Sequence, residues 1–399
     1  MRIGIGCRTI LNPTLGEGAG VGHYTYFLVK HLLAIDHENE YVLFFDSRMQ
    51  DTAEFHKPNV TVRHFPFYQY KKFLPFSYSH MLITALLLKE RLDVFHTPGG
   101  MLPLTYPKKS IVTIHDLAIY KNPAWFPDQI ISTKLLVPQM IRNASHLIAV
   151  SKSTRDDLRH IFNVSPGKMS IVHEAPFVTS INLKDKDTDV LKKFRIKQPY
   201  VLFIGTLEPR KNLENLILAF EHLKKHRGHE DVQLVIAGSA GYRHEPILEK
   251  LNMPKYKQCI RYLGYVTHNE KLGLLRNAAV FAYPSLYEGF GLPVLEAMSM
   301  GVPVVTSNVS SLPEIGGKAV TYADPDKPSD IARVLGRILL NPEVAQEMAV
   351  RGREQAARFT WDQTARDTLA VYEKVGRKKE KGKREKVKGE KGKNGKRKK

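Results

Sequence analysis

The amino-acid sequence predicts an α/β protein with two doubly wound domains, each built on a parallel sheet. Apolar strand-like runs alternate with longer helical patterns from end to end, as in parallel sheets covered by helices. The 399 residues are too many for one ordinary hydrophobic core, and a hydrophobic content of 43% is ample for two. A polar, charged stretch over residues 179–198 separates the two alternating series, and we expect it to be the interdomain linker.

The individual elements follow in order along the chain. In the first half we expect strands over 2–7, 41–45, 60–64, 93–96, 110–114 and 147–150, and helices over 24–33, 79–90, 128–142 and 153–161. In the second half we expect strands over 200–204, 232–237, 260–263, 279–283 and 302–305, and helices over 342–358 and 360–372. Thr267 and Glu270 form a capping-box pattern, which predicts a helix that reaches Arg276.

These elements place the first domain at residues 1–178, the second at 199–357 and a terminal helix at 358–375. The remaining residues, 376–399, hold fourteen Lys or Arg and three Glu, which is +11 of the net charge of +20 and leaves +9 for the rest. This low-complexity tail has no aromatic residue and cannot bury enough apolar surface to fold alone, so we expect it to be disordered. Its composition is compatible with a solvated tail, an anionic membrane surface or nucleic acid.

Cysteine usage and hydropathy indicate the compartment. Cys7 and Cys259 lie far apart and form neither a disulfide nor a metal-ligand pattern, so a reducing, cytoplasmic environment is expected. No apolar run approaches the roughly 18 to 20 residues needed to cross a bilayer. No spacing of His, Cys or carboxylates suggests a metal site, and we expect neither a metal nor a cofactor.

Two carboxylates, Glu288 and Glu296, surround a glycine-rich strand-to-helix turn. The apolar run 279–283 ends at Pro284, and Pro293 suits the first turn of a following helix. Free amides at that helix start attract anions, and the two glutamates offer acceptors to polyhydroxyl groups such as sugar and ribose. The residues alone leave an alternative: Glu288 is only an acid that favours a helix start, and Glu296 only a solvated helix residue.

Two further turns present groups suited to phosphate. Gly16, Gly18, Gly20 and Gly22 follow the first strand and precede a helix, where glycine permits close backbone approach, although a flexible turn without a ligand has the same pattern. Arg210 and Lys211 follow the strand 200–204 and could neutralise a diphosphate. Exposed bases at a helix start are the alternative, but positive charge is unfavourable there.

His115 and Asp116 lie at the carboxyl end of the strand 110–114, where ligands bind in doubly wound sheets. A structural histidine is the alternative. The hydroxyl-rich turn around Ser151 and Thr154 mainly predicts a helix cap. His173 and Glu174 have no assigned chemistry and are expected to serve a local loop.

The segment 68–76 mixes basic with aromatic residues. It predicts either an acceptor or membrane face or a packed connection between a loop and a helix. The apolar run 82–88 that follows is expected to lie in the core.

One string in the second half resembles the signature of the family 4 retaining glycosyltransferases of the GT-B fold. It runs from Glu288 through Gly289, Phe290, Gly291 and Leu292 to Glu296, with Gly301 and Pro303 after it. The resemblance covers roughly residues 1–375. It implies two Rossmann-like domains that face each other across a cleft, with a terminal helix crossing back to the first domain. The first-domain glycine loop looks most like that of bacterial mannosyltransferases.

The resemblance also implies roles for the residues singled out above. Glu288 is expected to bind the donor sugar, with the amides of Gly289, Phe290, Gly291 and Leu292 beside it. Glu296 is expected to bind the ribose. Lys211 and Arg210 are expected to bind the diphosphate, with Gly20 and Gly22 nearby. His115 is expected to contact the transferred sugar. Asp116 and His23 are expected at the acceptor or in support of His115. Two departures weaken the match, because many members carry Arg at the positions of His23 and Thr206.

The implied activity is transfer of a hexose from a nucleotide diphosphate sugar, with retention at the anomeric carbon. We expect mannose from GDP-mannose, with UDP-glucose and UDP-N-acetylglucosamine as alternative donors, and a saccharide or lipid-linked saccharide as acceptor in cell-surface polysaccharide or glycoconjugate synthesis. The same resemblance favours the membrane over nucleic acid as the partner of the tail, and hence a peripheral site on the inner face of the membrane. A GT-B sugar-nucleotide epimerase and a noncatalytic protein that binds through its basic tail are the alternatives.

Overall fold

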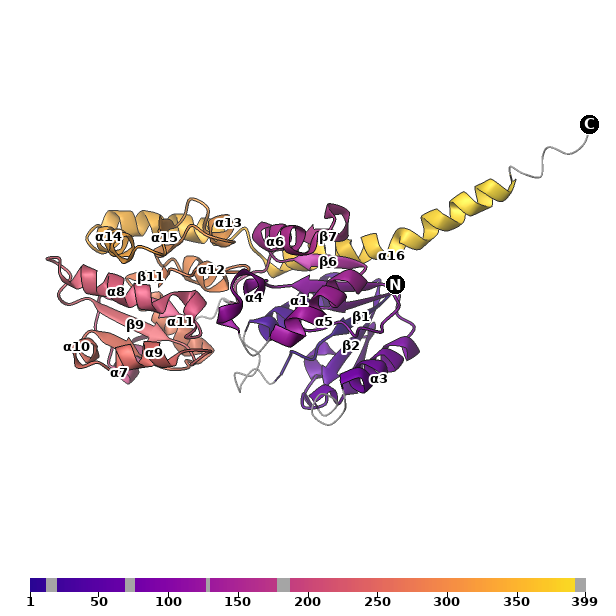
Figure 1. The fold of residues 1–399 in the computed structure, drawn as a ribbon, viewed down its shortest axis with the longest axis horizontal. Coiled ribbons are helices and arrows are strands. Elements are labelled where there is room, and N and C mark those ends of the chain that lie inside the picture. The colour runs from indigo at the N-terminus through magenta and orange to yellow at the C-terminus, as the bar shows by residue number, and fades with distance from the viewer. Residues whose placement is uncertain (12–19, 69–75, 127–129, 178–186, 392–399) are drawn as a thin grey trace, which may run out of the picture.

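The computed structural model describes residues 1–11, 20–68, 76–126, 130–177 and 187–391. Two α/β domains lie end to end, and the long terminal helix α16 (Trp361–Lys391) runs along the first domain and extends past it (Figure 1). Both sheets are entirely parallel and doubly wound, as the sequence predicts. The fold class is therefore confirmed.

The first domain is built on a seven-stranded sheet with the order β3-β2-β1-β4-β5-β6-β7. Its strands are β1 (Arg2–Gly6), β2 (Glu40–Asp46), β3 (Val60–Phe65), β4 (Val94–Thr97), β5 (Ser110–Ile114), β6 (His146–Ala149) and β7 (Met169–Ile171). Its helices are α1 (Val21–Ile35), α3 (Phe76–Lys89), α4 (Ala118–Lys121), α5 (Ile130–Asn143) and α6 (Lys152–Phe162). The strand order reverses between β1 and β4, so the loops that follow these strands border the crevice of the first sheet.

The second domain is built on a six-stranded sheet with the order β10-β9-β8-β11-β12-β13. Its strands are β8 (Tyr200–Ile204), β9 (Gln233–Ala237), β10 (Ile260–Tyr262), β11 (Val280–Tyr283), β12 (Val304–Ser307) and β13 (Thr321–Ala323). Its helices are α7 (Asp187–Phe194), α8 (Leu213–Lys224), α9 (Glu245–Leu251), α10 (Pro254–Lys257), α11 (His268–Asn277), α12 (Leu292–Ser299), α13 (Leu312–Gly316), α14 (Pro328–Leu339) and α15 (Pro342–Ala356). Here the order reverses between β8 and β11.

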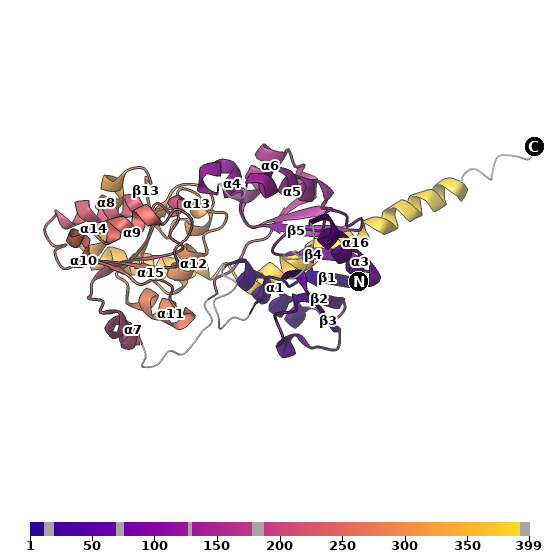
Figure 2. The same cartoon turned by 60° about the horizontal axis from the view of Figure 1, so that its bottom comes forward.

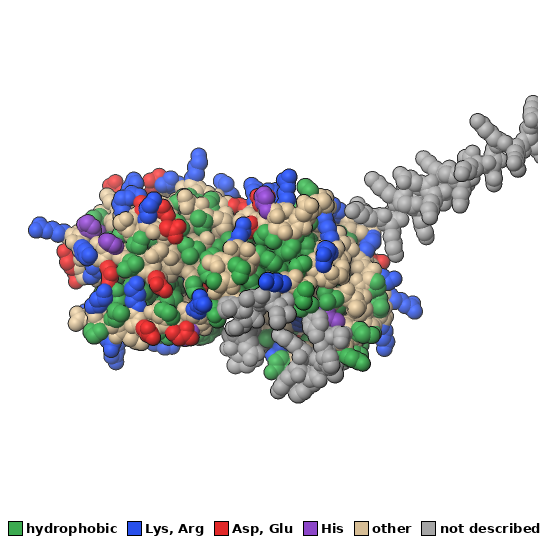
Figure 3. Space-filling view, viewed as in Figure 1, with side chains coloured by type: hydrophobic (Ala, Val, Ile, Leu, Met, Phe, Trp, Pro, Cys, Tyr) green, Lys and Arg blue, Asp and Glu red, His purple; other side chains and the backbone are tan. Residues whose placement is uncertain are grey.

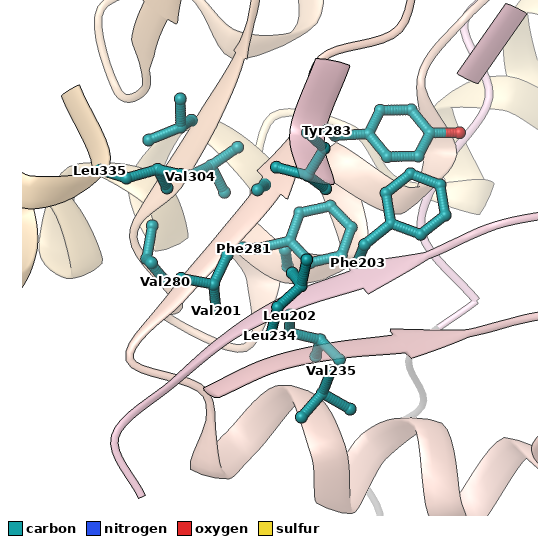
Figure 4. Close-up of a cluster of buried hydrophobic side chains, with 14 of the residues drawn as sticks. Val201, Leu202, Phe203, Leu234, Val235, Val280, Phe281, Tyr283, Val304 and Leu335 are labelled. Atoms are coloured by element: carbon teal, nitrogen blue, oxygen red, sulfur yellow. The ribbon is translucent and has the colours of Figure 1, made fainter. Parts of the chain in front are cut away.

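The central strands β8 and β11 are apolar because both of their faces are covered by helices. Val201, Leu202 and Phe203 of β8 are fully buried, as are Val280 and Phe281 of β11. Figure 4 shows these side chains packed together, with the ring of Tyr283 at the end of the cluster and its hydroxyl pointing away from it. The buried strands thus hold the turns that follow them in fixed positions.

The terminal helix α16 joins the core of the first domain. The Trp361 ring stacks on Phe27 and Phe177, with centroid distances of 5.4 and 5.8 Å. Further along, the Tyr372 hydroxyl lies 2.7 Å from Nδ1 of His96. The helix continues to Lys391, beyond the boundary expected at residue 375, through a stretch of Lys, Arg and Glu, which are good helix formers. No helix in the described ranges is long and apolar enough to cross a membrane.

Several elements differ from expectation. The three-residue strands β7 and β13 were not predicted, because such short runs carry little periodic signal. Helix α7 lies inside the stretch 179–198 expected as a linker, and its Val190 packs in the core of the second domain. The expectation that the apolar run 82–88 lies in the core is wrong in part, because Leu82 and Leu88 of α3 are exposed while Leu87 is buried.

Candidate active site

The candidate site lies at the switch point of the second sheet, where the turns after β8 and β11 meet. The turn after β8 brings Arg210 and Lys211 forward in a short helix over Pro209–Lys211, and Asn212 then adopts a left-handed conformation with φ of 60°. The Asn212 side chain donates to the carbonyl of Pro284, which lies directly after β11. This bond ties the two turns together, so Lys211 comes to lie beside Glu288.

Lys211 and Glu288 form a buried ion pair at the centre of the site. The Lys211 Nζ donates to Glu288 Oε1 at 2.5 Å and to the Tyr283 hydroxyl at 2.7 Å. Both side chains are about 8% exposed. The two predicted residues are therefore brought together. An ammonium group has three N–H donors, and the described residues accept from two of them here.

Arg210 lies on the other side of the same carboxylate. Its Nη1 donates to Glu288 Oε2 at 3.2 Å and to the carbonyl of Tyr287 at 3.4 Å. Its Nε lies 2.7 Å from Glu208 Oε1 but is not aligned for a hydrogen bond with it. Glu208, which the sequence did not single out, thus balances part of the Arg210 charge.

The charges of this cluster decide its protonation. Burial alone would raise the pKa of Glu288, but the cations of Lys211 and Arg210 outweigh burial and lower this pKa to about 2. Burial lowers the pKa of Lys211, and the adjacent Glu288 opposes that shift. We therefore describe Glu288 as an ionised carboxylate at neutral pH, held between two cations.

The turn that carries Glu288 is fastened on both sides. Within the second domain, the Glu288 amide donates to Ser310 Oγ at 2.9 Å, and Ser311 Oγ donates to the Phe290 carbonyl at 2.7 Å. From the first domain, Ser151 Oγ donates to the Gly289 carbonyl at 2.6 Å. Thr154 Oγ1 donates to the same carbonyl at 3.1 Å, which the sequence did not predict. The expected helix cap is also present, because Ser151 accepts from the Thr154 amide.

Gly289 lies directly against the first domain. A Cβ atom built on it would lie 1.8 Å from the carbonyl oxygen of His115 and 2.7 Å from the Cβ of Asp116. Only glycine can therefore occupy this position without moving the first domain. The contact places the end of β5 directly over the turn that holds Glu288.

His115 has both ring nitrogens engaged by the protein. Nδ1 lies 2.7 Å from Glu174 Oε1, and Nε2 lies 2.8 Å from the carbonyl oxygen of Pro98. Both partners are acceptors, so both nitrogens donate and the ring is an imidazolium. Burial acts to lower the pKa of His115, but the bond and charge of Glu174 outweigh it and raise this pKa. Glu174, expected to serve only a local loop, is the counter-ion of His115.

Asp116 is exposed, and its Oδ1 accepts from the amide of Ala118, the first residue of α4, at 3.1 Å. The neighbouring Tyr287 crosses between the domains, and its hydroxyl donates to Asp157 Oδ2 at 2.7 Å. Asp116 thus lies at the rim of the interdomain contact, with its carboxylate accessible.

Glu296 lies in α12 and is 4% exposed. Its Oε1 accepts from Lys271 Nζ at 2.6 Å, a partner in α11 that the sequence did not single out. His23 of α1 belongs to the same region. Burial and the Lys271 charge lower the pKa of His23, while Glu296 acts to raise it. His23 therefore brings the first domain close to the predicted ribose site.

The glycine loop is described only at its end, since Gly16 and Gly18 lie outside the described residues. Gly20 precedes α1 with φ of 61° and has open space around its α-carbon. A Cβ atom on Gly22 would lie 2.5 Å from the carbonyl oxygen of Thr9, so this glycine allows α1 to pack on the loop after β1.

Phe290, Gly291 and Leu292 form the start of α12. Phe290 is 4% exposed and packs in the core. Gly291 has φ of 112°, which suits glycine. Within the described ranges, no three His, Cys, Asp or Glu side chains are grouped so as to hold a metal ion.

Two family models match the chain. The one described as Glycosyltransferase Family 4 matches residues 18–175, and the one described as Glycosyl transferases group 1 matches residues 186–355. O-antigen chain mannosyltransferase B of Escherichia coli is 30% identical over 365 residues, which cover 88% of this chain and 95% of that protein.

Solved structures share the fold. Sucrose-phosphate synthase from Thermosynechococcus elongatus is 20% identical with a TM-score of 0.71, covering 94% of this chain and 99% of that one. Anabaena HepE in complex with UDP-glucose is 16% identical with a TM-score of 0.69, covering 93% of this chain and 100% of that one. At these identities the likeness shows the GT-B arrangement of two domains.

Proposed function

The chain belongs to the family 4 glycosyltransferases, and on that premise we propose that it transfers a hexose from a nucleotide diphosphate sugar to a saccharide or lipid-linked saccharide, with retention at the anomeric carbon. The observation that carries the proposal is the buried pair of Lys211 and Glu288 opposite His115. It combines a cation for a diphosphate with an acceptor for sugar hydroxyls at the point where two α/β domains meet.

In this proposal Lys211 and Arg210 bind the diphosphate of the donor. As the bond from the sugar to the diphosphate breaks, negative charge grows on the leaving group, and cations fixed in a closed cleft stabilise it. The third N–H of Lys211, which has no hydrogen-bond acceptor in the described part of the chain, supports this role. With two cations at the diphosphate, we propose that the reaction needs neither a metal nor a cofactor.

Glu288 holds the hydroxyls of the transferred sugar. Its two oxygens already face Lys211 and Arg210, which supports an acceptor role rather than attack on the anomeric carbon. In the same proposal Glu296 binds the ribose, and the amides from Gly289 to Leu292 lie beside the donor. His115 contributes positive charge through its protonated ring, because both of its N–H groups are taken by the protein.

For the donor we propose GDP-mannose, and the support is the similarity to an O-antigen chain mannosyltransferase over nearly the whole chain. UDP-glucose is the second candidate, which the fold shared with HepE in its UDP-glucose complex supports. We propose a product in cell-surface polysaccharide or glycoconjugate synthesis. We place the enzyme in the cytoplasm, with the basic residues 376–399 at the inner face of the membrane.

The test is release of nucleoside diphosphate by the purified protein across a panel of GDP- and UDP-sugars, with and without an acceptor extract of lipids and saccharides. Release from one donor that depends on acceptor is the expected result, and NMR of the product gives its anomeric configuration. Isomerised sugar nucleotide without acceptor would instead indicate an epimerase.

Glu288→Gln is the matching variant, and we expect it to lower the rate by roughly a hundredfold or more, because it removes the charge that orients Lys211. Glu249→Gln, on the exposed face of α9, is the control. Circular dichroism establishes whether both variants remain folded. Near-normal turnover of the folded Glu288→Gln protein would contradict the role given to Glu288.

A further inference from the structure

Arg8 follows the carboxyl end of β1, at the switch point of the first sheet, and is partly buried. The chain begins at the end of the first domain that is distant from the second, so β1 runs toward the second domain (Figures 1 and 2). Ligands of doubly wound sheets bind outside the carboxyl ends of the strands at such a point. Arg8 therefore lies on the side of the first domain that is turned toward the second.

The turn after β4 lies between Arg8 and His115. Nη2 of Arg8 donates to the Met101 carbonyl at 3.3 Å, and Nε2 of His115 lies 2.8 Å from the carbonyl oxygen of Pro98. A Cβ atom on Gly100 would lie 2.0 Å from Nη2 and 2.7 Å from Nε of Arg8, so the guanidinium packs directly on the glycine backbone. Arg8 and His115 therefore hold opposite ends of one short turn.

The charge of Arg8 has no carboxylate of its own. Within the described ranges, its guanidinium makes the one hydrogen bond to Met101, and the acid whose charge reaches it is Asp46 at the end of β2. Both oxygens of Asp46 are engaged elsewhere, since Oδ1 accepts from Arg48 Nε at 2.7 Å and Oδ2 accepts from the Tyr68 amide at 2.9 Å. Burial lowers the pKa of Arg8, and Asp46 opposes that shift. Two guanidinium groups thus share one carboxylate.

His80 of α3 is a near neighbour of Arg8 and carries no charge at neutral pH. Burial lowers the pKa of His80, and the charge of Arg8 lowers it further. On the face in Figure 3, acidic side chains gather on the second domain and are sparse on the first. A partly buried cation without its own counter-ion costs free energy of folding, and a bound anion would offset that cost.

We propose that Arg8 binds a phosphate group of the acceptor, on the opposite side of the β4 turn from His115. The inference rests on the proposed function, in which Lys211 and Arg210 already bind the diphosphate of the donor and the acceptor supplies a second anion. A guanidinium presents its N–H groups in a fixed fork that matches phosphate, and such charged hydrogen bonds are about twice as strong as neutral ones. A lipid-linked saccharide and a sugar phosphate would each supply the group.

The test measures binding to the full chain by isothermal titration calorimetry, with and without a saturating concentration of GDP or UDP, whichever the protein binds. The nucleotide fills the proposed donor site at Lys211, so a second phosphate must bind elsewhere. The probes are mannose 1-phosphate, geranyl diphosphate and the uncharged methyl mannoside. We expect the nucleotide-loaded protein to bind a phosphate probe at least about tenfold more tightly than methyl mannoside. Tighter binding of geranyl diphosphate would assign the phosphate to a lipid linker, and tighter binding of mannose 1-phosphate would assign it to a sugar.

Arg8→Gln removes the charge, and we expect it to lose this tenfold preference while the binding of methyl mannoside stays unchanged. Arg8→Lys keeps a point charge and should retain part of the preference. Arg159→Gln, exposed on α6, is the matched control and should bind as the wild type does. Thermal unfolding separates this role from a structural one. Because Arg8 has no carboxylate of its own, Arg8→Gln should be at least as stable as the wild type.

Equal binding of the phosphate probes by Arg8→Gln and the wild type would overturn the proposal. Glucuronate that binds as tightly as the phosphate probes would overturn the assignment to phosphate. A large loss of stability in Arg8→Gln with unchanged binding would assign Arg8 to the fold. Failure of both nucleotides to bind would contradict the proposed function instead, and the comparison of Arg8→Gln with the wild type would still be made in the nucleotide-free protein.

Discussion

Replacement of Gly289 by alanine tests the contact between the two domains most directly. The new methyl group would meet the His115 carbonyl oxygen at 1.8 Å and the Asp116 Cβ at 2.7 Å. Carbon atoms do not approach other heavy atoms so closely, and both contacts involve parts of the first domain that a side-chain rotation cannot move. We therefore expect the variant to separate the end of β5 from the Glu288 turn.

The magnitude follows from these distances. To restore an ordinary separation of at least 3.0 Å, the two backbones must move apart by more than 1 Å. Overpacking of this kind costs about 1 to 3 kcal/mol. The bonds from Ser151 and Thr154 to the Gly289 carbonyl would weaken too, at about 0.5 to 1.5 kcal/mol each. A displacement of about 1 Å lowers a catalysed rate by roughly a hundredfold.

The assay combines donor turnover with thermal unfolding. We expect Gly289→Ala to lose roughly a hundredfold in turnover while the second domain stays folded, since the clash lies at its surface. Gly167→Ala is the control, because Gly167 is exposed and a Cβ there meets nothing within 4 Å. Wild-type turnover and stability in Gly289→Ala would refute the inference that His115 and Gly289 are in contact in the active protein.

Two further variants test the buried charges. In Glu174→Gln, the pKa of His115 should fall, as measured by NMR titration. In the wild type, Glu174 raises the folded-state pKa of His115 above 6.5 and should contribute about 1.5 to 3 kcal/mol to the free energy of unfolding. This contribution is complete below pH 6.5 and is lost as the pH rises through the folded-state pKa. An unchanged His115 titration would count against the pair. Tyr283→Phe removes an acceptor from the buried Lys211 ammonium and should cost about 1 to 3 kcal/mol by denaturant unfolding. The exposed Tyr265→Phe serves as its control, and equal stability of the two variants would contradict the role of Tyr283.

The sheets could be predicted because strands buried on both faces are continuous apolar runs. The strand expected over 200–204 is β8 to the residue, and the capping box at Thr267 is present. The rotation of α3 about its axis could not be predicted, because a run of apolar residues does not show which side of the helix faces the core. Its inward side makes contacts with residues distant in the sequence, since Leu87 packs in the core of the first domain and Thr84 meets Thr105.

The candidate site was predictable where it depends on turns that follow central strands. Lys211 and Glu288 meet because β8 and β11 are neighbours whose carboxyl ends lie at one edge of the sheet. The partners Glu174 and Lys271 could not be found in this way. Each comes from a different element and is brought in only by three-dimensional packing, and a lone charged residue in a loop or helix carries no signal of its own.

The way in which α16 begins bears on how the two domains can move. The chain passes between the domains twice, once after Phe177 and once before Trp361. These two crossings are bonded to each other, since the Trp361 indole donates to the Pro176 carbonyl at 3.1 Å and Thr364 Oγ1 donates to the His173 carbonyl at 2.8 Å. Because these bonds hold the two crossings side by side, we expect them to act as one hinge about which the two domains would rotate when the cleft opens and closes.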